Sequence, residues 1–233
     1  MRYPAEQTAA RHQRILQEAS RLFRERGIGG VSLPEVMKAA ELTHGPFYNH
    51  FASKEALVAE CLKDAMDAQL RGLKSTKRSK AAIHEILDGY LCPQHRDSVG
   101  DGCVMPALAG EIARHPGARA AFTQYAKDFV SVLAEKLAST GVRKDEARAE
   151  ALRMWVGLVG AVILARAVDD RTLSDEILAR THADLRGALL GGGRARGSRP
   201  TARATRPSGS RRSRATSTKR RRRSDDKDWP TMP

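Results

Sequence analysis

Two helix-start signals close together constrain the N-terminal part of this chain most strongly. Segment 32–35 reads Ser-Leu-Pro-Glu, which predicts a capped helix whose first turn tolerates the proline because no N–H is needed there. Segment 43–46 reads Thr-His-Gly-Pro and predicts a second start of the same kind. Residues 32–40 and 43–50 are therefore expected to form two short helices joined by a tight turn.

Helical spacing continues on both sides of this pair. Before it, apolar residues recur at helical intervals up to Gly27, a frequent helix terminator. After it, Ser53 predicts the cap of a helix over 54–73. Further helices are expected at 80–91, 103–114, 117–139, 143–168 and 173–190. No stretch alternates convincingly between apolar and polar residues. The predicted fold class is all-α, with a three-helix helix-turn-helix unit at the N-terminus and a larger helical region after it.

The positive charge is concentrated at one end of the chain. Of the net charge of +14, the segment from 191 onward supplies +11, and residues 1–190 carry only +3. This segment is too polar to bury a core and is predicted to be a disordered basic tail. We therefore expect three regions, 1–53, 54–190 and 191–233. The basic run 219–223 is either a non-specific arm for DNA phosphates or a solvated extension, and both interpretations remain open.

Several classes of protein are disfavoured by composition. The three cysteines, Cys61, Cys92 and Cys103, lack the spacing of a metal site, so neither a structural metal nor a cofactor is expected. The longest apolar run, 154–165, has twelve residues, whereas a membrane span needs about 20. We find no phosphate loop or catalytic constellation and expect no enzyme. The polar N-terminus favours a cytoplasmic protein without a membrane partner.

The second helix of a helix-turn-helix lies in the major groove, where its first residues meet base edges. Thr43 and His44 offer hydrogen bonds, and Gly45 permits close backbone approach. Tyr48 adds a hydroxyl suited to a phosphate, and Asn49 adds an amide suited to adenine. The segment therefore predicts a double-stranded DNA partner.

Residues 13–60 resemble the N-terminal domain of the tetracycline-repressor (TetR) family. The resemblance rests on the apolar positions of the first helix and above all on segment 45–57, which reads Gly-Pro-Phe-Tyr-Asn-His-Phe-Ala-Ser-Lys-Glu-Ala-Leu. Segment 28–30, Ile-Gly-Gly, departs from the family pattern and implies a looser turn between the first two helices.

This resemblance implies roles for individual residues. Tyr48 and Lys54 are expected to contact phosphates, 43–46 and Asn49 to face bases, and Ser32 to anchor the first helix of the motif. His50 is either a DNA contact or a packing residue. The full set of expected DNA-binding residues is Ser32, Thr43, His44, Gly45, Pro46, Tyr48, Asn49, His50 and Lys54.

Family members carry a helical domain after this motif that dimerises and binds a small effector. Helix 143–168 is rich in apolar residues, and Gly157 and Gly160 permit close helix approach. Together with helix 173–190 it is expected to form a four-helix homodimer interface. The alternative is that both helices pack only within one subunit.

Segment 102–111, which opens Gly-Cys-Val-Met-Pro, resembles a TetR subgroup in which some members respond to electrophiles or oxidants. A helix N-terminus lowers a thiol pKa, so Cys103 is expected either to sense such compounds or to be a small buried residue. An effector pocket is expected among the helices that follow the motif. Its candidate lining residues, each of which could equally be core, are Met66, His84, Tyr90, Phe122, Tyr125 and Trp155.

These observations predict a sequence-specific DNA-binding transcriptional regulator. It is expected to be a homodimeric repressor that leaves a palindromic operator when a small-molecule or electrophile effector binds. The effector would move helix 54–73 and change the spacing of two recognition helices about 34–36 Å apart. The alternative is an architectural DNA-binding protein, largely indifferent to sequence and driven by the basic tail.

Overall fold

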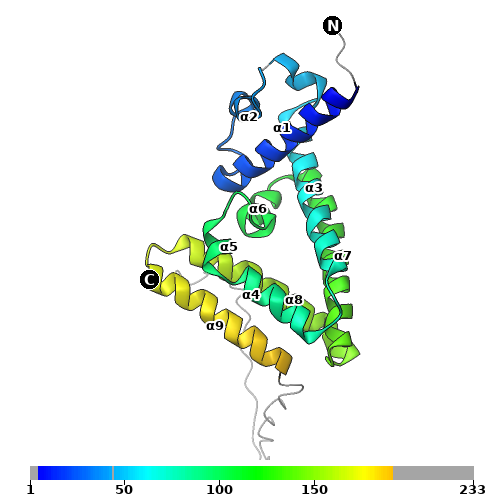
Figure 1. Ribbon diagram of the computed structural model, residues 1–233, viewed down its shortest axis with the longest axis vertical. Coiled ribbons are helices and arrows are strands. Elements are labelled where there is room, and N and C mark those ends of the chain that lie inside the picture. Colours follow the sequence, from blue (N-terminus) through cyan, green and yellow to red (C-terminus); the bar gives the residue numbers. More distant parts are fainter. Residues whose placement is uncertain (1–4, 44, 191–233) are drawn as a thin grey trace, which may run out of the picture. The chain divides into compact units, whose positions relative to one another are not determined.

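The computed structural model describes residues 5–43 and 45–190, which form helices joined by short turns (Figure 1). No β-strand occurs among these residues, which confirms the predicted all-α class. None of the described helices is long and apolar enough to span a bilayer. The predicted basic tail lies outside the described residues. The elements are α1 (Ala5–Arg26), α2 (Leu33–Ala39), the 3₁₀ turn η1 (Gly45–Asn49), α3 (Lys54–Ser75), α4 (Lys80–Tyr90), α5 (Pro93–Asp97), α6 (Val104–Ile112), α7 (Pro116–Ser139), α8 (Lys144–Ala167) and α9 (Arg171–Leu190).

Local capping explains where the first helices begin and end. Helix α1 stops at Gly27, whose φ of +76° suits a residue without a Cβ. Helix α2 starts with the expected capping box: Glu35 N donates to the Ser32 hydroxyl, and Ser32 N donates to Glu35 Oε2 at 2.8 Å. Ser53 accepts from Ala56 N and caps α3 in the same way.

The first hydrophobic cluster joins α1, α2, η1, α3, α6 and the first half of α7. Phe47 and Leu57 are completely buried in it, and Phe51 stacks on Phe47 with ring centroids 5.7 Å apart. These three residues are therefore core residues, as the helical spacing indicated. They support the turn η1 from beneath.

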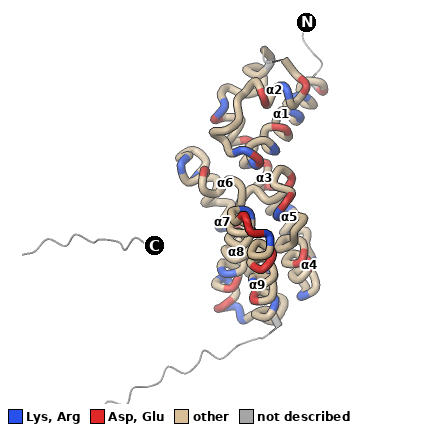
Figure 2. Tube along the Cα trace, turned by 90° about the vertical axis from the view of Figure 1, so that its left-hand side faces the viewer, with Lys and Arg blue, Asp and Glu red and all other residues tan. Residues whose placement is uncertain are grey.

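A second hydrophobic cluster lies among α4, α7, α8 and α9 and reaches Leu73 at the end of α3. Helix α9 lies beside both α8 and α4 (Figure 1). Basic and acidic residues are interspersed over all these helices (Figure 2), in agreement with the small net charge of residues 1–190. Phe129 and Trp155 pack against both clusters, so the two cores meet at these side chains.

Two local expectations were wrong. The segment expected as a helix over 43–50 is only the 3₁₀ turn η1, because it must fit between the end of α2 and the Ser53 cap while Phe47 is buried. The short helix α5, which opens with Pro93 after the Cys92 position, was not expected. The remaining helices lie within about two residues of their predicted ends.

Candidate DNA interface and effector cavity

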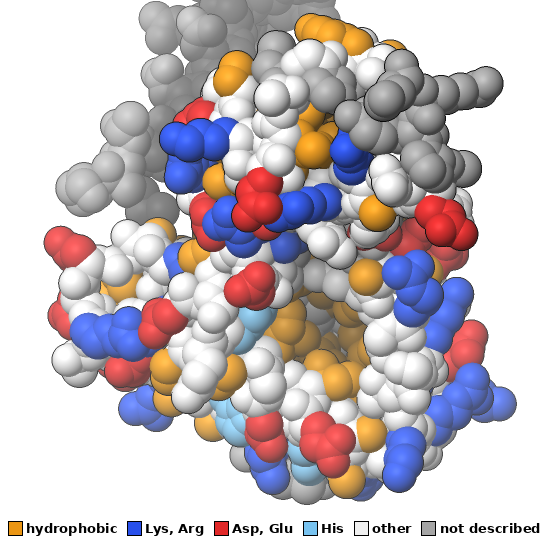
Figure 3. All heavy atoms as spheres, turned by 45° about the horizontal axis from the view of Figure 1, so that its top comes forward, with side chains coloured by type: hydrophobic (Ala, Val, Ile, Leu, Met, Phe, Trp, Pro, Cys, Tyr) orange, Lys and Arg blue, Asp and Glu red, His pale blue; other side chains and the backbone are white. Residues whose placement is uncertain are grey.

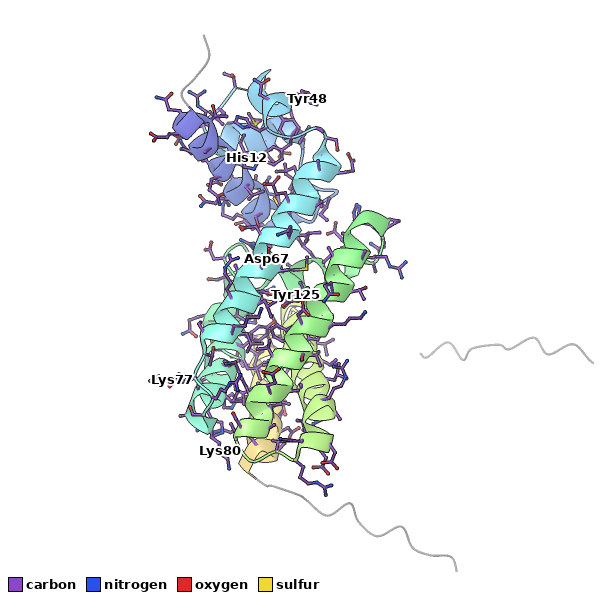
Figure 4. All side chains as sticks on the ribbon, turned by 90° about the vertical axis from the view of Figure 1, so that its right-hand side faces the viewer. His12, Tyr48, Asp67, Lys77, Lys80 and Tyr125 are labelled. Carbon is purple, nitrogen blue, oxygen red and sulfur yellow. The ribbon has the colours of Figure 1, made fainter. Side chains whose placement is uncertain are left out.

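The turn η1 presents its polar residues outward. Tyr48 is 65% exposed, and its ring lies perpendicular to that of buried Phe47, with the ring centroids 5.2 Å apart. Thr43, Gly45 and Asn49 are also exposed. Figure 4 places Tyr48 at the end of the N-terminal helices that is remote from Tyr125. Among the other expected base contacts, His44 lies outside the described residues, as does the side chain of Pro46. The exposed side chains of η1 are thus available to a partner.

Lys54 has a structural role that the sequence did not suggest. Its ammonium donates to the carbonyl oxygens of Ile28 and Val31 at 2.7 and 2.6 Å. The turn between α1 and α2 is therefore held from inside, and the looseness expected from Gly29 and Gly30 is not found. Because an ammonium has three N–H donors, the phosphate contact predicted for Lys54 keeps one donor available.

His50 is half-buried beside a second histidine. His12 Nε2 lies 2.6 Å from Glu60 Oε1, and the His12 ring stacks on Phe51 and lies 5.9 Å from the His50 ring. Burial lowers the pKa of His50, and the neighbouring His12 and Arg11 lower it further. These contacts agree with a packing role for His50.

A cavity of about 500 Å³ lies among α3, α4, α7 and α8, and the loop before α6 closes one side of it. Figure 3 shows a hollow lined by hydrophobic side chains. Its wall consists of Arg24, Ala65, Ala68, Gln69, Gly72, Leu73, Thr76, Ile86, Tyr90, His95, Asp101, Gly102, Cys103, Val104, Tyr125, Phe129, Trp155 and Leu158. This volume lies within the range of small-molecule sites.

A row of polar groups crosses the mainly apolar wall of this cavity. Tyr125 Oη donates to Gln69 Oε1 at 2.9 Å, and Gln69 Nε2 donates to the Cys103 sulfur at 2.9 Å. Aromatic rings lie beside this row, with the Phe129 and Trp155 centroids 5.2 Å apart. The cavity therefore combines an aromatic surface with a few oriented hydrogen-bonding groups, a combination suited to a largely apolar ligand with one or two polar atoms.

The lowered pKa that a sensing Cys103 would need is not found, and the structure agrees better with the alternative of a small buried residue. Cys103 does begin α6, and its sulfur accepts from Met105 N, but burial raises the pKa of the thiol. The cost of desolvating a thiolate outweighs the favourable donors around it. The same cause raises the pKa of Cys61 to about 12. Both thiols are therefore protonated at neutral pH.

His95 is fixed as a neutral ring at the cavity wall. Its Nδ1 lies 2.8 Å from Tyr90 O, and its Nε2 lies 3.1 Å from Cys103 N, whose N–H it accepts. Nδ1 must therefore carry the proton. Burial lowers the pKa of His95, as does the positive charge of Arg166. His95 thus ties α5 to the start of α6.

Four of the seven expected effector residues line the cavity: Cys103, Tyr90, Tyr125 and Trp155. The other three do not. Met66 is buried in the first cluster, and Phe122 packs against Trp155 at 6.3 Å without forming part of the wall. His84 lies on α4 with its buried Nε2 lacking a hydrogen-bond partner.

Sequence reasoning missed Arg24, Gln69 and His95, all of which line the cavity. For Gln69 a signal existed: it is a polar residue at the helical spacing otherwise occupied by Met66 and Leu73. Arg24 and His95 carry no such signal, because they reach the cavity from α1 and from the unexpected helix α5.

Residues 15–61 match the family model "Bacterial regulatory proteins, tetR family", and residues 80–178 match the model of the LmrA/YxaF-like transcriptional regulator C-terminal domain. The chain belongs to the TetR family. This chain is accordingly a DNA-binding transcriptional regulator with the helix-turn-helix at its N-terminus, and the resemblance read from segment 45–57 is confirmed.

Curated relatives agree with this assignment. The chain is 29% identical over 145 residues to the HTH-type transcriptional repressor DhaR of a Mycobacterium species, a match that covers 57% of this chain and 70% of DhaR. It is 46% identical over 48 residues to the regulator AcrR of Shigella flexneri, covering 21% of this chain and 22% of AcrR.

Solved structures show the same fold. The reduced form of Escherichia coli NemR matches with a TM-score of 0.63 at 22% identity, covering 76% of this chain and 96% of NemR. A TetR regulator of Chloroflexus aurantiacus matches with a TM-score of 0.66 at 20% identity, covering 79% of this chain and 96% of its own. The similarity extends over nearly the whole of both relatives.

Proposed function

We propose that this chain is a homodimeric repressor that binds a palindromic operator and is released by a small-molecule effector. The observation that carries the proposal is the position of the cavity. Its wall includes Gln69 of α3, the helix that begins a few residues after η1 (the proposed recognition turn), and Arg24 of α1, a helix that packs in the same hydrophobic cluster as η1. A ligand in the cavity therefore contacts the elements that orient η1, and shifts their arrangement by its differential affinity for two states.

On the DNA side, we propose that the recognition turn enters the major groove. Residues 43–46 and Asn49 would face bases, and Tyr48 and the third donor of Lys54 would contact phosphates. Ser32 would anchor α2 through its capping box, and His50 would pack against His12. A regulator acting on the chromosome in this way would reside in the cytoplasm, on the nucleoid.

For the homodimer we propose the exposed apolar stripe of α8 and the start of α9. Val156 is 68% exposed, and Gly160 follows four residues later, where an added Cβ would meet no other atom within 4 Å. A partner helix would approach closely at that glycine. The other exposed apolar residues of the stripe are Leu152, Ile163, Leu164 and Leu173.

The cavity favours an effector that binds reversibly. Gln69 and Tyr125 supply oriented polar groups, whereas Cys103 is a protonated thiol with a raised pKa. Attack by Cys103 on an electrophile would be slow, because the thiolate is the nucleophile. A largely apolar small molecule is therefore the better-supported effector.

The test is a salt titration of binding to DNA taken from beside the protein's own gene, compared with scrambled DNA. It uses the full chain and residues 1–190. We expect both proteins to prefer the native fragment, with a shallower salt dependence for the shorter one, because fewer phosphates are neutralised. A loss of all binding on truncation would favour the architectural alternative, for which the comparisons give no support.

A further inference from the structure

Helix α6 links the cavity to the turn that follows α1. Cys103 and Val104, at its start, line the cavity. Glu111, near its other end, lies against the turn at Gly27 and Ile28. Helix α6 packs against both α1 and α8, and Figure 1 shows it between them. Helix α6 has only nine residues, so the cavity wall and Glu111 are joined by one short element.

The Glu111 carboxylate contacts the turn at Gly27 and Ile28. Its Oε2 accepts from Ile28 N at 2.8 Å, and Ile28 is only 5% exposed, so its N–H depends on this acceptor. A Cβ at Gly27 would lie 2.6 Å from Glu111 Oε1. Glycine at this position therefore makes room for the carboxylate as well as permitting the positive φ.

The carbonyl group of Ile28 connects this contact to the helix that follows η1. Ile28 O accepts from Lys54, the first residue of α3, which follows η1 after a few residues. Both backbone polar groups of Ile28 are thus bound by side chains distant in sequence. Helix α6 runs from the cavity wall to Glu111, and hydrogen bonds then lead from Glu111 through Ile28 to Lys54, the first residue of the helix that follows η1.

A second attachment holds α1 to the loop before α6. Arg24 Nε donates to Gly100 O at 2.5 Å, and a Cβ at Gly100 would meet Glu25 Oε1 at 2.5 Å. Arg24 and the neighbouring Asp101 both line the cavity. The loop is therefore pressed against α1 where a ligand would lie, so both ends of α6 are tied to α1.

We propose that Glu111 is the positioning residue that transmits occupancy of the cavity to the recognition turn, through its hydrogen bond to the Ile28 amide. This inference rests on the cavity being the effector site proposed above. A ligand that displaces the start of α6 withdraws the carboxylate from Ile28. The Lys54 contact then loses its fixed partner, and η1 is released from its orientation.

The test compares the full chain with two variants, using neutral aminoanthracene as the cavity probe. Glu111→Met keeps a side chain of similar size without an oxygen, and Glu111→Gln keeps an acceptor. Hydrogen exchange of the backbone segment 26–33 is measured with and without the probe, whose fluorescence reports binding. In the unmodified chain the probe should change exchange of this segment by about fivefold or more. Glu111→Gln should retain this change, and Glu111→Met should lose it while still binding the probe.

Control variants distinguish the role of Glu111 from the role of the cavity as the effector site. Glu85→Ala, an exposed glutamate on α4, should behave like the unmodified chain. Ala68→Glu puts a charge on an exposed part of the cavity wall and should weaken probe binding. If Glu111→Met fails to fold, Gly27→Ala disturbs the same contact from the other side.

An equal exchange response in Glu111→Met and the unmodified chain would overturn the role of Glu111. So would bound probe without any response in the unmodified chain. Probe binding that is absent, or indifferent to Ala68→Glu, would instead reject the cavity as the effector site, and the inference would fall with it.

Discussion

At the scale of single residues, Lys54 shows how one side chain serves both structure and binding. Its two hydrogen bonds to Ile28 O and Val31 O close the turn between α1 and α2. The same residue begins the helix that follows the recognition turn. A cation there stabilises the turn and remains near the proposed path of the DNA backbone.

Replacing Lys54 with Met keeps the apolar stem and removes the ammonium. Hydrogen bonds from a charged donor contribute about 1.5–3 kcal/mol each, and Lys54 is only partly buried, so we expect a loss of about 2 kcal/mol in the free energy of unfolding. Urea unfolding measures it, with Lys63→Met, an exposed lysine paired with Asp67, as the matched control. Equal stability of the two variants would contradict the structural role of Lys54.

His95 predicts a dependence of stability on pH. Its pKa is lowered in the folded protein by burial and by Arg166, whereas an unfolded histidine titrates near about 6.5. The unfolded state therefore binds more protons in acid, so stability is complete above about pH 6.5 and falls as the pH drops towards the folded pKa. His95→Gln should show a smaller loss between about pH 7.5 and about pH 5.5 in urea titrations. His50, whose pKa is also lowered, should account for part of the remaining slope. An unchanged slope in His95→Gln would rule out this assignment.

At the scale of elements, α8 has two different faces. Ala151, Met154 and Leu158 are buried against α7 and α9, whereas Leu152 and Val156 are exposed. A helix that is apolar on both faces, in a chain whose core is already filled, points to a second buried surface.

Val156→Glu should therefore weaken self-association. Burying one unpaired carboxylate costs several kcal/mol, and the two-fold symmetry introduces it twice, so we expect at least about a hundredfold increase in the dimer dissociation constant. Sedimentation velocity measures it, with Ala120→Glu on the exposed side of α7 as the control. An intact dimer in both variants would place the interface elsewhere.

At the scale of the described unit, the two hydrophobic clusters are joined and not independent. Trp155 and Phe129 contact both clusters, and α3 extends from the first to the second. The cavity that we propose as the effector site lies at this junction. Ligand binding is therefore expected to stabilise both clusters together.

Trp155→Ala should make the backbone amides of both clusters exchange faster. We expect their free energy of opening to fall by about 3 kcal/mol. Phe122→Ala is the contrasting variant, because Phe122 packs against the first cluster and not against the second. Its effect should be larger in α1 and α3 than in α9. Trp155→Ala effects confined to one cluster would show that the clusters unfold separately.

Local signals in the sequence determined most of the helices, the capping box at Ser32, the stop at Gly27 and the helix-turn-helix motif. They did so because caps, turns and helical periodicity depend on residues within a few positions of one another. The same reasoning recovered four cavity residues, since aromatic residues and Cys103 stand out on apolar helix faces.

Tertiary structure decided what distant residues do to one another. The contacts of Glu111 with Ile28 and of Lys54 with Val31 join residues 83 and 23 positions apart, and no local pattern predicts them. The raised pKa of Cys103 arises from burial, which overrides the helix N-terminus on which the sequence argument relied. The shortening of the recognition segment to a 3₁₀ turn likewise follows from burying Phe47 between two capped helices, because packing outweighs local preference.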